Sequence, residues 1–236
     1  MLSGQPTVRV DQVSESTNCP TTTLIQGRNH FELARYGFNI VLISRNQSKL
    51  DGVKQEILRK TPNVEVLTIL FDFTNTNLAD YEEKIFKQLN RLDVGVLVNN
   101  VGKYVEYPNR FDKIAGGIKT WTDITLINTL PVTLLTFEVL KQMIPRNAGI
   151  VINISSSSSY HHIRYWSVYS ATKKFVSHFT HVLSKEFNNT GIVFQVAYIF
   201  ALPGLMADFF MDKINLITRK RAIRRNQKVA IKKDSN

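Results

Sequence analysis

The chain has 236 residues, of which 43% are hydrophobic, so it is long enough to form one domain around a sizeable core. Its single cysteine, Cys19, excludes an internal disulfide and favours a reducing, cytoplasm-facing environment. The formal net charge is +11, and most of it lies near the end of the chain.

The N-terminal part gives weak structural signals. Residues 1–20 show no hydrophobic periodicity, so we expect a loose segment there. The next stretch, Thr21–Gln26, is predicted to be a short strand. His30–Tyr36 has the pattern of a helix, and Gly37 is placed to end it as the residue after the C-cap.

From residue 38 onward, apolar strand patterns alternate with amphipathic helix patterns. We expect strands at Phe38–Ser44, Val64–Phe71, Val94–Val98, Gly149–Ile154 and Ile192–Tyr198. We expect helices at Ser48–Lys60, Tyr81–Leu89, Lys119–Met143 (bent at Pro131) and Ser167–Phe187. This alternation predicts an α/β fold with a doubly wound parallel sheet, whose ligands lie beyond the carboxyl ends of the strands. The predicted domain covers residues 21–210 and is followed by a basic tail, 211–236.

The basic tail contains nine lysines and arginines and no acid between positions 213 and 233. They are Lys213, Arg219, Lys220, Arg221, Arg224, Arg225, Lys228, Lys232 and Lys233. Such a tail can contact anionic lipid headgroups or nucleic acid, or form the solvated face of a last helix. No nucleic-acid-binding motif accompanies it, so we predict no nucleic-acid partner.

Neither a membrane anchor nor a metal site is predicted. Residues 1–20 are polar and do not resemble a signal peptide. Gly191–Phe210 is apolar, but polar residues, a proline and a glycine interrupt it, so we interpret it as a buried strand and a loop. The adjacent His161 and His162 diverge in any regular structure, and no other group has metal-ligand spacing.

The stretch Ser155–Lys173 holds three residue types that together suit proton transfer. Tyr169 and Lys173 are four residues apart, which places them one turn apart on one face of a helix. Ser156 follows a predicted strand, whose end meets the next helix start at one rim of a parallel sheet. A lysine cation moves the pKa of a tyrosine from about 10 toward neutrality, and a serine hydroxyl can hold the substrate oxygen. The trio suits hydride transfer at a carbon that bears oxygen, although Tyr-x-x-x-Lys also occurs by chance on solvated helix faces.

Longer motifs surround this trio. Tyr-Ser-Ala-Thr-Lys at 169–173, Asn-Ile-Ser-Ser at 153–156 and Leu-Val-Asn-Asn-Val-Gly at 97–102 resemble the short-chain dehydrogenase/reductase family. The resemblance covers about Phe31–Val196 and is closest to the microsomal branch, the 17β-hydroxysteroid dehydrogenases and very-long-chain 3-oxoacyl-CoA reductases. It implies an NADP(H)-dependent oxidoreductase that interconverts a ketone and an alcohol, with a 3-oxoacyl-CoA or 17-ketosteroid as substrate. It also implies a location at the cytoplasmic face of the endoplasmic reticulum, and dimers formed through the two long helices.

The resemblance assigns four catalytic positions. Tyr169 is the acid/base, Lys173 lowers its pKa and holds the nicotinamide ribose, and Ser156 orients the carbonyl. Asn128 supports a water that relays protons to the lysine, although a structural asparagine would fit the same helical pattern.

The implied cofactor-binding residues are Arg45, Asp72, Asn99, Gly102, Tyr169 and Lys173. Arg45 directly follows a strand, where a basic residue faces the adenosine 2′-phosphate and favours NADP(H) over NAD(H); an ordinary surface arginine is the alternative. Asp72 is expected beside the adenine, and Asn99 and Gly102 are expected to shape the floor of the cofactor cleft.

The sequence departs from the family at two places. The glycine-rich phosphate turn before the first helix is missing, and Gly27 is the one glycine nearby, so that helix is expected to have lost about two turns. After Val196 the chain runs into Pro203-Gly204 and the basic tail, without most of the substrate-covering region. We therefore expect a Rossmann-like fold truncated at its first strand–helix turn and after its sixth strand. The alternative to an enzyme is a catalytically impaired relative that acts as a binding or dimerisation partner.

Overall fold

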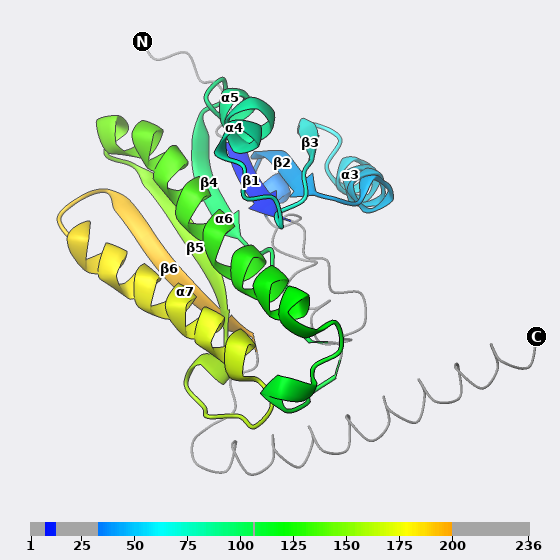
Figure 1. Ribbon diagram of the computed structural model, residues 1–236. Helices are drawn as coiled ribbons and strands as arrows, with labels where there is room; N and C mark the ends of the chain where they lie inside the picture. Colours follow the sequence, from blue (N-terminus) through cyan, green and yellow to red (C-terminus); the bar gives the residue numbers. More distant parts are fainter. Residues whose placement is uncertain (1–7, 13–32, 106, 200–236) are drawn as a thin grey trace, which may run out of the picture.

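The computed structural model describes residues 8–12, 33–105 and 107–199. Its centre is a parallel sheet in the order β3-β2-β1-β4-β5-β6, which confirms the doubly wound α/β prediction (Figure 1). The strands are β1 (Val8–Gln12), β2 (Asn39–Ser44), β3 (Val66–Leu70), β4 (Val94–Asn99), β5 (Gly149–Ser156) and β6 (Ile192–Ile199).

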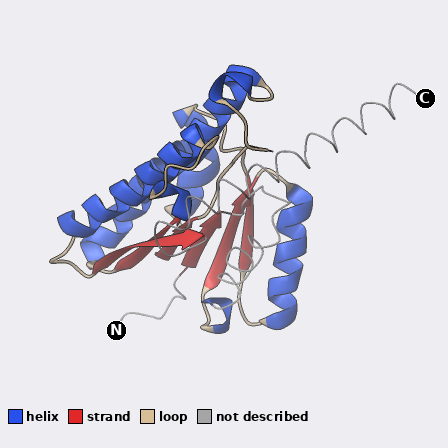
Figure 2. Ribbon diagram, turned by 90° about the horizontal axis from the view of Figure 1, so that it is seen from below, coloured by secondary structure: helices blue, strands red, loops and turns tan. Residues whose placement is uncertain are grey.

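Helices cover both sides of this sheet (Figure 2). They are α3 (Gln47–Lys60), α4 (Leu78–Tyr81), α5 (Lys87–Leu89), α6 (Gly117–Arg146) and α7 (Ser167–Glu186), and a π-helical segment, Glu82–Phe86, joins α4 to α5. The long helices α6 and α7 pack side by side along β4, β5 and β6, whereas α3 packs against β2 and β3 (Figure 1). These elements match the predictions from residue 38 onward, with shifts of a few residues at their ends.

Strand β2 shows why the sheet needs helices on both sides. Ile40 and Leu42 point into the same core as Leu50 and Ile57 of α3. The alternate residues Val41 and Ile43 belong to the larger core on the other side, with side chains of α6. A strand that is buried on both faces reads as a continuous apolar run, which is why it was recognisable from the sequence.

The first strand lies elsewhere than expected. Residues 8–12 form β1, which pairs with both β2 and β4 at the middle of the sheet, so the prediction of a loose segment is wrong at these residues. Their sequence, Val-Arg-Val-Asp-Gln, carries charged residues at alternate positions, which hid a central strand from a search for apolar runs. The expected strand at Thr21–Gln26 lies outside the described residues, as does the basic tail.

The position of β1 also changes the number of residues between the first strand and the first helix. Twenty residues, 13–32, connect β1 to the described helix end, where the expectation had only Gly27 and three residues. The expected loss of about two turns concerns residues before Leu33, which lie outside the described ranges. Gly27 remains the single glycine among those twenty residues.

Gly37 ends the first helix as predicted. Its φ of +84° is left-handed, which glycine adopts at low cost. The amide of Gly37 donates to the carbonyl of Ala34, and that of Phe38 to the carbonyl of Leu33. These two bonds define a Schellman C-cap, which directs the chain straight into β2.

Helix α6 is a core helix that also passes a simple test for a membrane span. Among the described residues it is the one helix long and apolar enough to cross a membrane. Half of its most apolar stretch is buried inside the fold, and residues such as Trp121, Ile127 and Val139 belong to its cores. The helix continues without interruption through Pro131.

Candidate active site

Tyr169 and Lys173 lie one turn apart on α7, as their spacing predicted. The Nζ of Lys173 is 5.8 Å from the centre of the Tyr169 ring. It also donates a hydrogen bond to the backbone carbonyl of Ile154 on β5, at 3.0 Å. The side chain is 4% exposed, and burial lowers the pKa of Lys173 from 10.5 to about 8. Within the described part of the chain, this carbonyl is the one hydrogen-bond acceptor of the ammonium, which carries three donors.

Ser156 ends β5 two residues beyond Ile154, so the strand that accepts from Lys173 also carries the serine. Its Oγ accepts hydrogen bonds from the backbone amide of Ser158, at 3.2 Å, and from the Ser158 hydroxyl, at 3.0 Å. Both bonds use lone pairs of Ser156. Its own hydroxyl hydrogen has no acceptor in the described ranges and is left to donate.

The neighbouring Ser155 points the other way and holds α7 against β5. Its hydroxyl donates to the carbonyl of Lys173 at 2.8 Å and shares a hydrogen bond with the hydroxyl of Ser177 at 2.7 Å. Because Ser155 gives its one hydrogen to this carbonyl, the Ser177 hydroxyl is the donor in the bond between the two serines, and it lies 3.0 Å from the same carbonyl. The sequence motifs gave no role to either residue, although side chains at adjacent strand positions must point to opposite faces.

Asn128 on α6 is buried and joins three segments. Its Oδ1 accepts from the amide of Lys103 at 2.8 Å, while its Nδ2 donates to the Lys103 carbonyl at 3.0 Å and to the hydroxyl of Thr172 at 2.9 Å. The amide group therefore fixes the loop after β4 to the turn of α7 that carries Lys173. This geometry is compatible with both roles expected for Asn128, a structural one and the support of a relay water. One lone pair of Oδ1 remains to accept a hydrogen bond from such a water.

Gly102 lies where this loop passes over the site. A Cβ at this position would be 3.2 Å from Oδ1 of Asn128 and 3.3 Å from Nζ of Lys173. Both distances are tighter than an ordinary contact, so a side chain here would displace the two polar groups. The loop is thus a close cradle that brings Gly102, Asn128 and Lys173 together.

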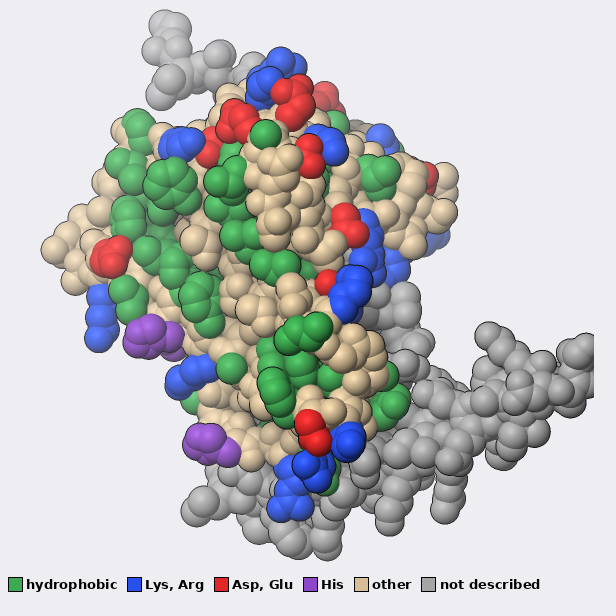
Figure 3. All heavy atoms as spheres, viewed as in Figure 1, with side chains coloured by type: hydrophobic (Ala, Val, Ile, Leu, Met, Phe, Trp, Pro, Cys, Tyr) green, Lys and Arg blue, Asp and Glu red, His purple; other side chains and the backbone are tan. Residues whose placement is uncertain are grey.

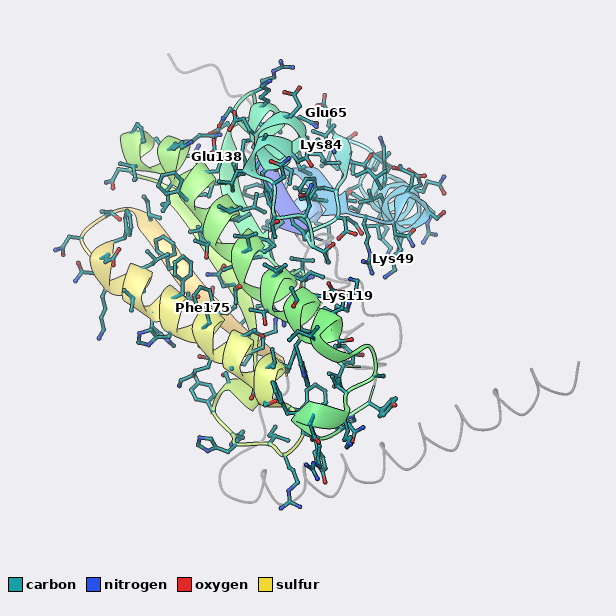
Figure 4. All side chains as sticks on the ribbon, in the orientation of Figure 1. Lys49, Glu65, Lys84, Lys119, Glu138 and Phe175 are labelled. Carbon is teal, nitrogen blue, oxygen red and sulfur yellow. The ribbon has the colours of Figure 1, made fainter. Side chains whose placement is uncertain are left out.

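The side chain of Lys103 ties the same loop to α6. Its Nζ lies 2.7 Å from Asp123, which also binds Lys119, the residue labelled near the start of α6 in Figure 4. The hydrogen bond from Lys103, with help from Lys119, holds the pKa of Asp123 below its usual value. No motif identified this ion pair in the sequence, because it depends on the conformation of the loop.

The side chain of Asn99 is buried and hydrogen-bonded to side chains of other elements. Its Nδ2 donates to Thr136 on α6 at 3.1 Å and to Asn153 on β5 at 2.8 Å. Asn153 continues the chain to Thr180 on α7 at 2.9 Å. This buried network links the two long helices through the sheet, next to the cradle formed by Gly102.

Arg45 and Asp72 form a second, more exposed cluster. Arg45 directly follows β2 and Asp72 lies two residues beyond β3. Their side chains meet at 3.5 Å, with a little under half of each exposed. Burial alone would raise the pKa of Asp72, but hydrogen bonds from Thr74 and the charge of Arg45 outweigh it, so its pKa lies below the usual value. The structure brings these residues together at the same rim of the sheet as the cradle.

Sequence reasoning missed the aromatic side chains around Tyr169. The ring of Trp166 lies 5.1 Å from that of Tyr169, and the ring of Tyr104 lies 6.2 Å from it, both edge-on. Tyr104 comes from the loop after β4 and Trp166 immediately precedes α7. Aromatic residues outside a motif carry no signal of this kind, because their proximity arises only in the fold.

A family model described as short chain dehydrogenase matches residues 30–214 of this sequence. The chain belongs to this family of oxidoreductases. A putative steroid dehydrogenase of Caenorhabditis elegans is 50% identical over 165 residues, and a very-long-chain 3-oxoacyl-CoA reductase of Caenorhabditis briggsae is 51% identical over 165 residues. Each alignment covers 70% of this chain and 52% of the relative, so the chain spans about half the length of these relatives.

The fold is shared with solved structures of the same family. A short-chain dehydrogenase of Sphingobium yanoikuyae in complex with NADPH superimposes with a TM-score of 0.67 and 23% identity, covering 81% of this chain and 70% of that one. At that identity the likeness concerns the fold alone. The family as a whole binds nicotinamide cofactors, which agrees with the position of the candidate site at the carboxyl ends of the strands.

Proposed function

We propose that this protein is an NADP(H)-dependent oxidoreductase that interconverts a ketone and an alcohol through Ser156, Tyr169 and Lys173. The observation that carries the proposal is the buried Lys173 ammonium beside Tyr169, bonded to the strand that ends in Ser156. A buried ammonium with one acceptor is costly unless further partners complete its shell. A functional role explains why the fold keeps it there.

The side chains divide the work of proton transfer. The free hydroxyl hydrogen of Ser156 donates to the substrate oxygen and orients it toward Tyr169. Tyr169 gives its phenolic proton to that oxygen during reduction, and takes it back during oxidation. The ammonium of Lys173 favours the phenolate by its charge, and Asn128 holds the loop and the helix turn that position it.

The residues of the cradle fit a nicotinamide dinucleotide. Gly102 leaves space that a Cβ would fill, and the two unused donors of Lys173 suit the hydroxyls of a ribose. Arg45 would face a 2′-phosphate and Asp72 the adenine end, because both lie at the carboxyl ends of neighbouring strands. When bound, the cofactor supplies the hydride. Residues 13–32, where relatives carry their pyrophosphate-binding turn, lie outside the described ranges.

For the substrate, we propose a 3-oxoacyl thioester or a 17-ketosteroid. The names of the relatives from the two Caenorhabditis species support this class. The same branch of the family supports a location at the cytoplasmic face of the endoplasmic reticulum. The basic residues between 213 and 233 would favour contact with an anionic membrane surface there.

We also propose a dimer formed through α6 and α7. Hydrophobic side chains gather on the face over these helices (Figure 3). They include Phe137, 67% exposed on α6, and Phe175 and Val182 on α7, and Phe175 stacks on Phe179. Exposed apolar surface of this kind is typical of protein interfaces.

The second candidate is a relative that binds partners without turning over substrate. The single glycine among residues 13–32 favours it, because backbone amides in a glycine-rich turn are the usual way to hold a pyrophosphate. This candidate keeps the dimer but requires no cofactor.

The assay of choice follows the oxidation of NADPH with 3-oxoacyl-CoA and 17-ketosteroid substrates, comparing the wild-type protein with the Tyr169→Phe variant. The proposal predicts turnover by the wild type and a loss of about 100-fold or more in the variant, which folds normally. Equal rates in both proteins would remove Tyr169 from the mechanism. No turnover of any ketone by a folded, cofactor-bound wild type would favour the second candidate.

A further inference from the structure

Three aromatic rings meet at the start of α7. Trp166 and Tyr169 are separated by 5.1 Å between ring centres, with planes 66° apart. Tyr104 stacks on Trp166 at 6.0 Å and 28°, and meets Tyr169 edge-on at 6.2 Å and 73°. Each ring therefore lies against the other two, and all three side chains are half-buried.

Two unfavourable features accompany the position of Trp166: a strained backbone at Tyr165 and an indole N–H without a partner in the described residues. Tyr165, directly before it, has a φ of +73°, which is unfavourable for a bulky residue. The indole Nε1 of Trp166 is buried and has no hydrogen-bond partner in the part of the chain that the structure describes. Both features destabilise the folded state, so an opposing benefit is expected where they persist.

Helix α7 also begins without the usual side-chain cap. Trp166 occupies the N-cap position and makes no capping hydrogen bond, although its carbonyl accepts from Ser170 at 2.8 Å. Serine, threonine, aspartate or asparagine normally hold this position. In the first turn of α7, which carries Tyr169, the rings of Trp166 and Tyr169 pack against each other beside the uncapped end.

Tyr104, the third ring of the cluster, follows a loop residue that is itself held in place. Tyr104 follows Lys103, whose backbone is held on both sides by Asn128 and whose side chain is paired with Asp123. Tyr169 itself also packs against a cluster that contains Trp121 and Ile124 of α6. The loop after β4 thus presents Tyr104 from an anchored segment.

We propose that Tyr104 and Trp166 are positioning residues that fix the ring of Tyr169 for proton transfer. Tyr104 holds Trp166, Trp166 holds Tyr169, and the three rings act as one unit. The inference rests on the proposed function in that Tyr169 is taken as the acid/base. It adds two residues outside the Ser-Tyr-Lys motif, and both act through Tyr169.

A fluorescence experiment tests the positioning without substrate or cofactor. The chain has two tryptophans, so Trp121→Phe leaves Trp166 as the single emitter. Ionised tyrosine absorbs where tryptophan emits, so ionisation of Tyr169 should quench Trp166 as the pH is raised. The comparison is between Tyr104→Phe, which keeps a ring, and Tyr104→Leu, which does not. A Tyr169→Phe version of each gives the background from all other tyrosines.

We expect the quenching that depends on Tyr169 to be strong with Tyr104→Phe and to lose amplitude or shift its midpoint with Tyr104→Leu. Equal amplitude and equal midpoint in the two variants would overturn the inference. This result does not depend on whether the protein turns over a ketone, so a failure of the proposed function is recognised separately, by the absence of NADPH oxidation.

A double-mutant cycle provides the catalytic readout. Tyr104→Leu and Trp166→Leu should each lower kcat on the order of tenfold, with little change in the KM for cofactor, because a misplaced acid/base slows the chemical step. The double variant should lose little more than either single variant, since the rings act together. The phenylalanine variants should recover most of the rate.

The control is Tyr36→Leu, the same chemical change at a residue that is 78% exposed, which should leave kcat unchanged. Folded leucine variants with wild-type kcat, or losses that simply multiply in the double variant, would contradict the proposal. Should Trp166→Leu fail to fold, the comparison of Tyr104→Leu with Tyr104→Phe decides the question.

Discussion

The Nζ of Lys173 and the carbonyl oxygen of Ile154 are 3.0 Å apart and join α7 to β5 inside the protein. This bond places a charged group, 4% exposed, between the helix that carries Tyr169 and the strand that ends at Ser156. The carbonyl of Ile154 thus connects the part of the candidate site on α7 to the part on β5. The bond also gives the buried ammonium a hydrogen-bond acceptor. The burial of this charge should be measurable as a pH dependence of stability.

Replacement of Lys173 by methionine should change how stability depends on pH. Burial lowers the pKa of Lys173 to about 8 in the folded chain, whereas the unfolded chain keeps the usual 10.5. Between these values the unfolded chain binds more protons, so the free energy of unfolding rises with pH there and is lowest below about pH 8. The wild type should therefore gain stability relative to Lys173→Met as the pH rises from about 8 to 10.5.

Denaturant unfolding at a series of pH values checks this, since the other titrating groups are common to both proteins and cancel in the difference. A difference that stays constant across this range would show that the lysine titrates as it does in an unfolded chain. Methionine keeps most of the aliphatic volume, so loss of packing contributes little.

Gly102→Ala should disturb the cradle. The new Cβ would press on Asn128 and Lys173 at 3.2 and 3.3 Å, and forced repacking of this kind costs about 1–3 kcal/mol of stability. We also expect a lower kcat, because both neighbours move. The matched control is Gly52→Ala on α3, where a Cβ meets nothing within 4 Å and should stabilise the helix by about 0.5–1 kcal/mol. Thermal unfolding of the two variants side by side measures the contrast, and two stabilised proteins would refute the crowded cradle.

Arg45→Gln should weaken the binding of NADPH but leave the binding of NADH almost unchanged. If the guanidinium faces a 2′-phosphate, its loss removes a charged hydrogen bond worth about 1.5–3 kcal/mol, which weakens NADPH binding about 10- to 100-fold. Binding of NADH should change little. Isothermal titration with both cofactors is the measurement. An equal effect on both, or on neither, would make Arg45 an ordinary surface residue that pairs with Asp72.

Phe175→Glu should weaken the proposed dimer. The side chain is 41% exposed on α7 and stacks on Phe179, and a carboxylate placed in an apolar interface would pay for its desolvation. Light scattering as a function of concentration should show dimers for the wild type and monomers for the variant. Tyr36→Glu, at a more exposed position away from α6 and α7, is the control. Monomers in the wild type at every concentration would exclude the dimer.

Periodicity predicted most of the fold because the central strands are buried on both faces. Strand β2 reads as Asn-Ile-Val-Leu-Ile-Ser, and such a run leaves few alternatives. Strand β1 was missed because Arg9 and Asp11 alternate with its valines, and only its pairing with β2 and β4 reveals a central position. Register with neighbouring strands is a tertiary property that no local window contains.

The candidate site also contained residues that could be predicted from the sequence and residues that could not. The helical spacing of Tyr169 and Lys173 fixed their proximity in advance, and the strand end before them placed Ser156 nearby. The contacts of Lys103 with Asn128 and Asp123 were not predictable, because the conformation of the loop after β4 determines them. The rings of Tyr104 and Trp166 meet Tyr169 for the same reason.

We propose that the cradle around Lys173 and Gly102 receives NADPH although residues 13–32 contain a single glycine. Titration of the purified protein with NADPH, followed by cofactor or tryptophan fluorescence, tests it most directly. We expect saturable binding in the micromolar range, which Gly102→Ala weakens. No binding at millimolar cofactor by a protein with a folded circular-dichroism spectrum would contradict it, and the Ser156-Tyr169-Lys173 arrangement would then be inherited without being used.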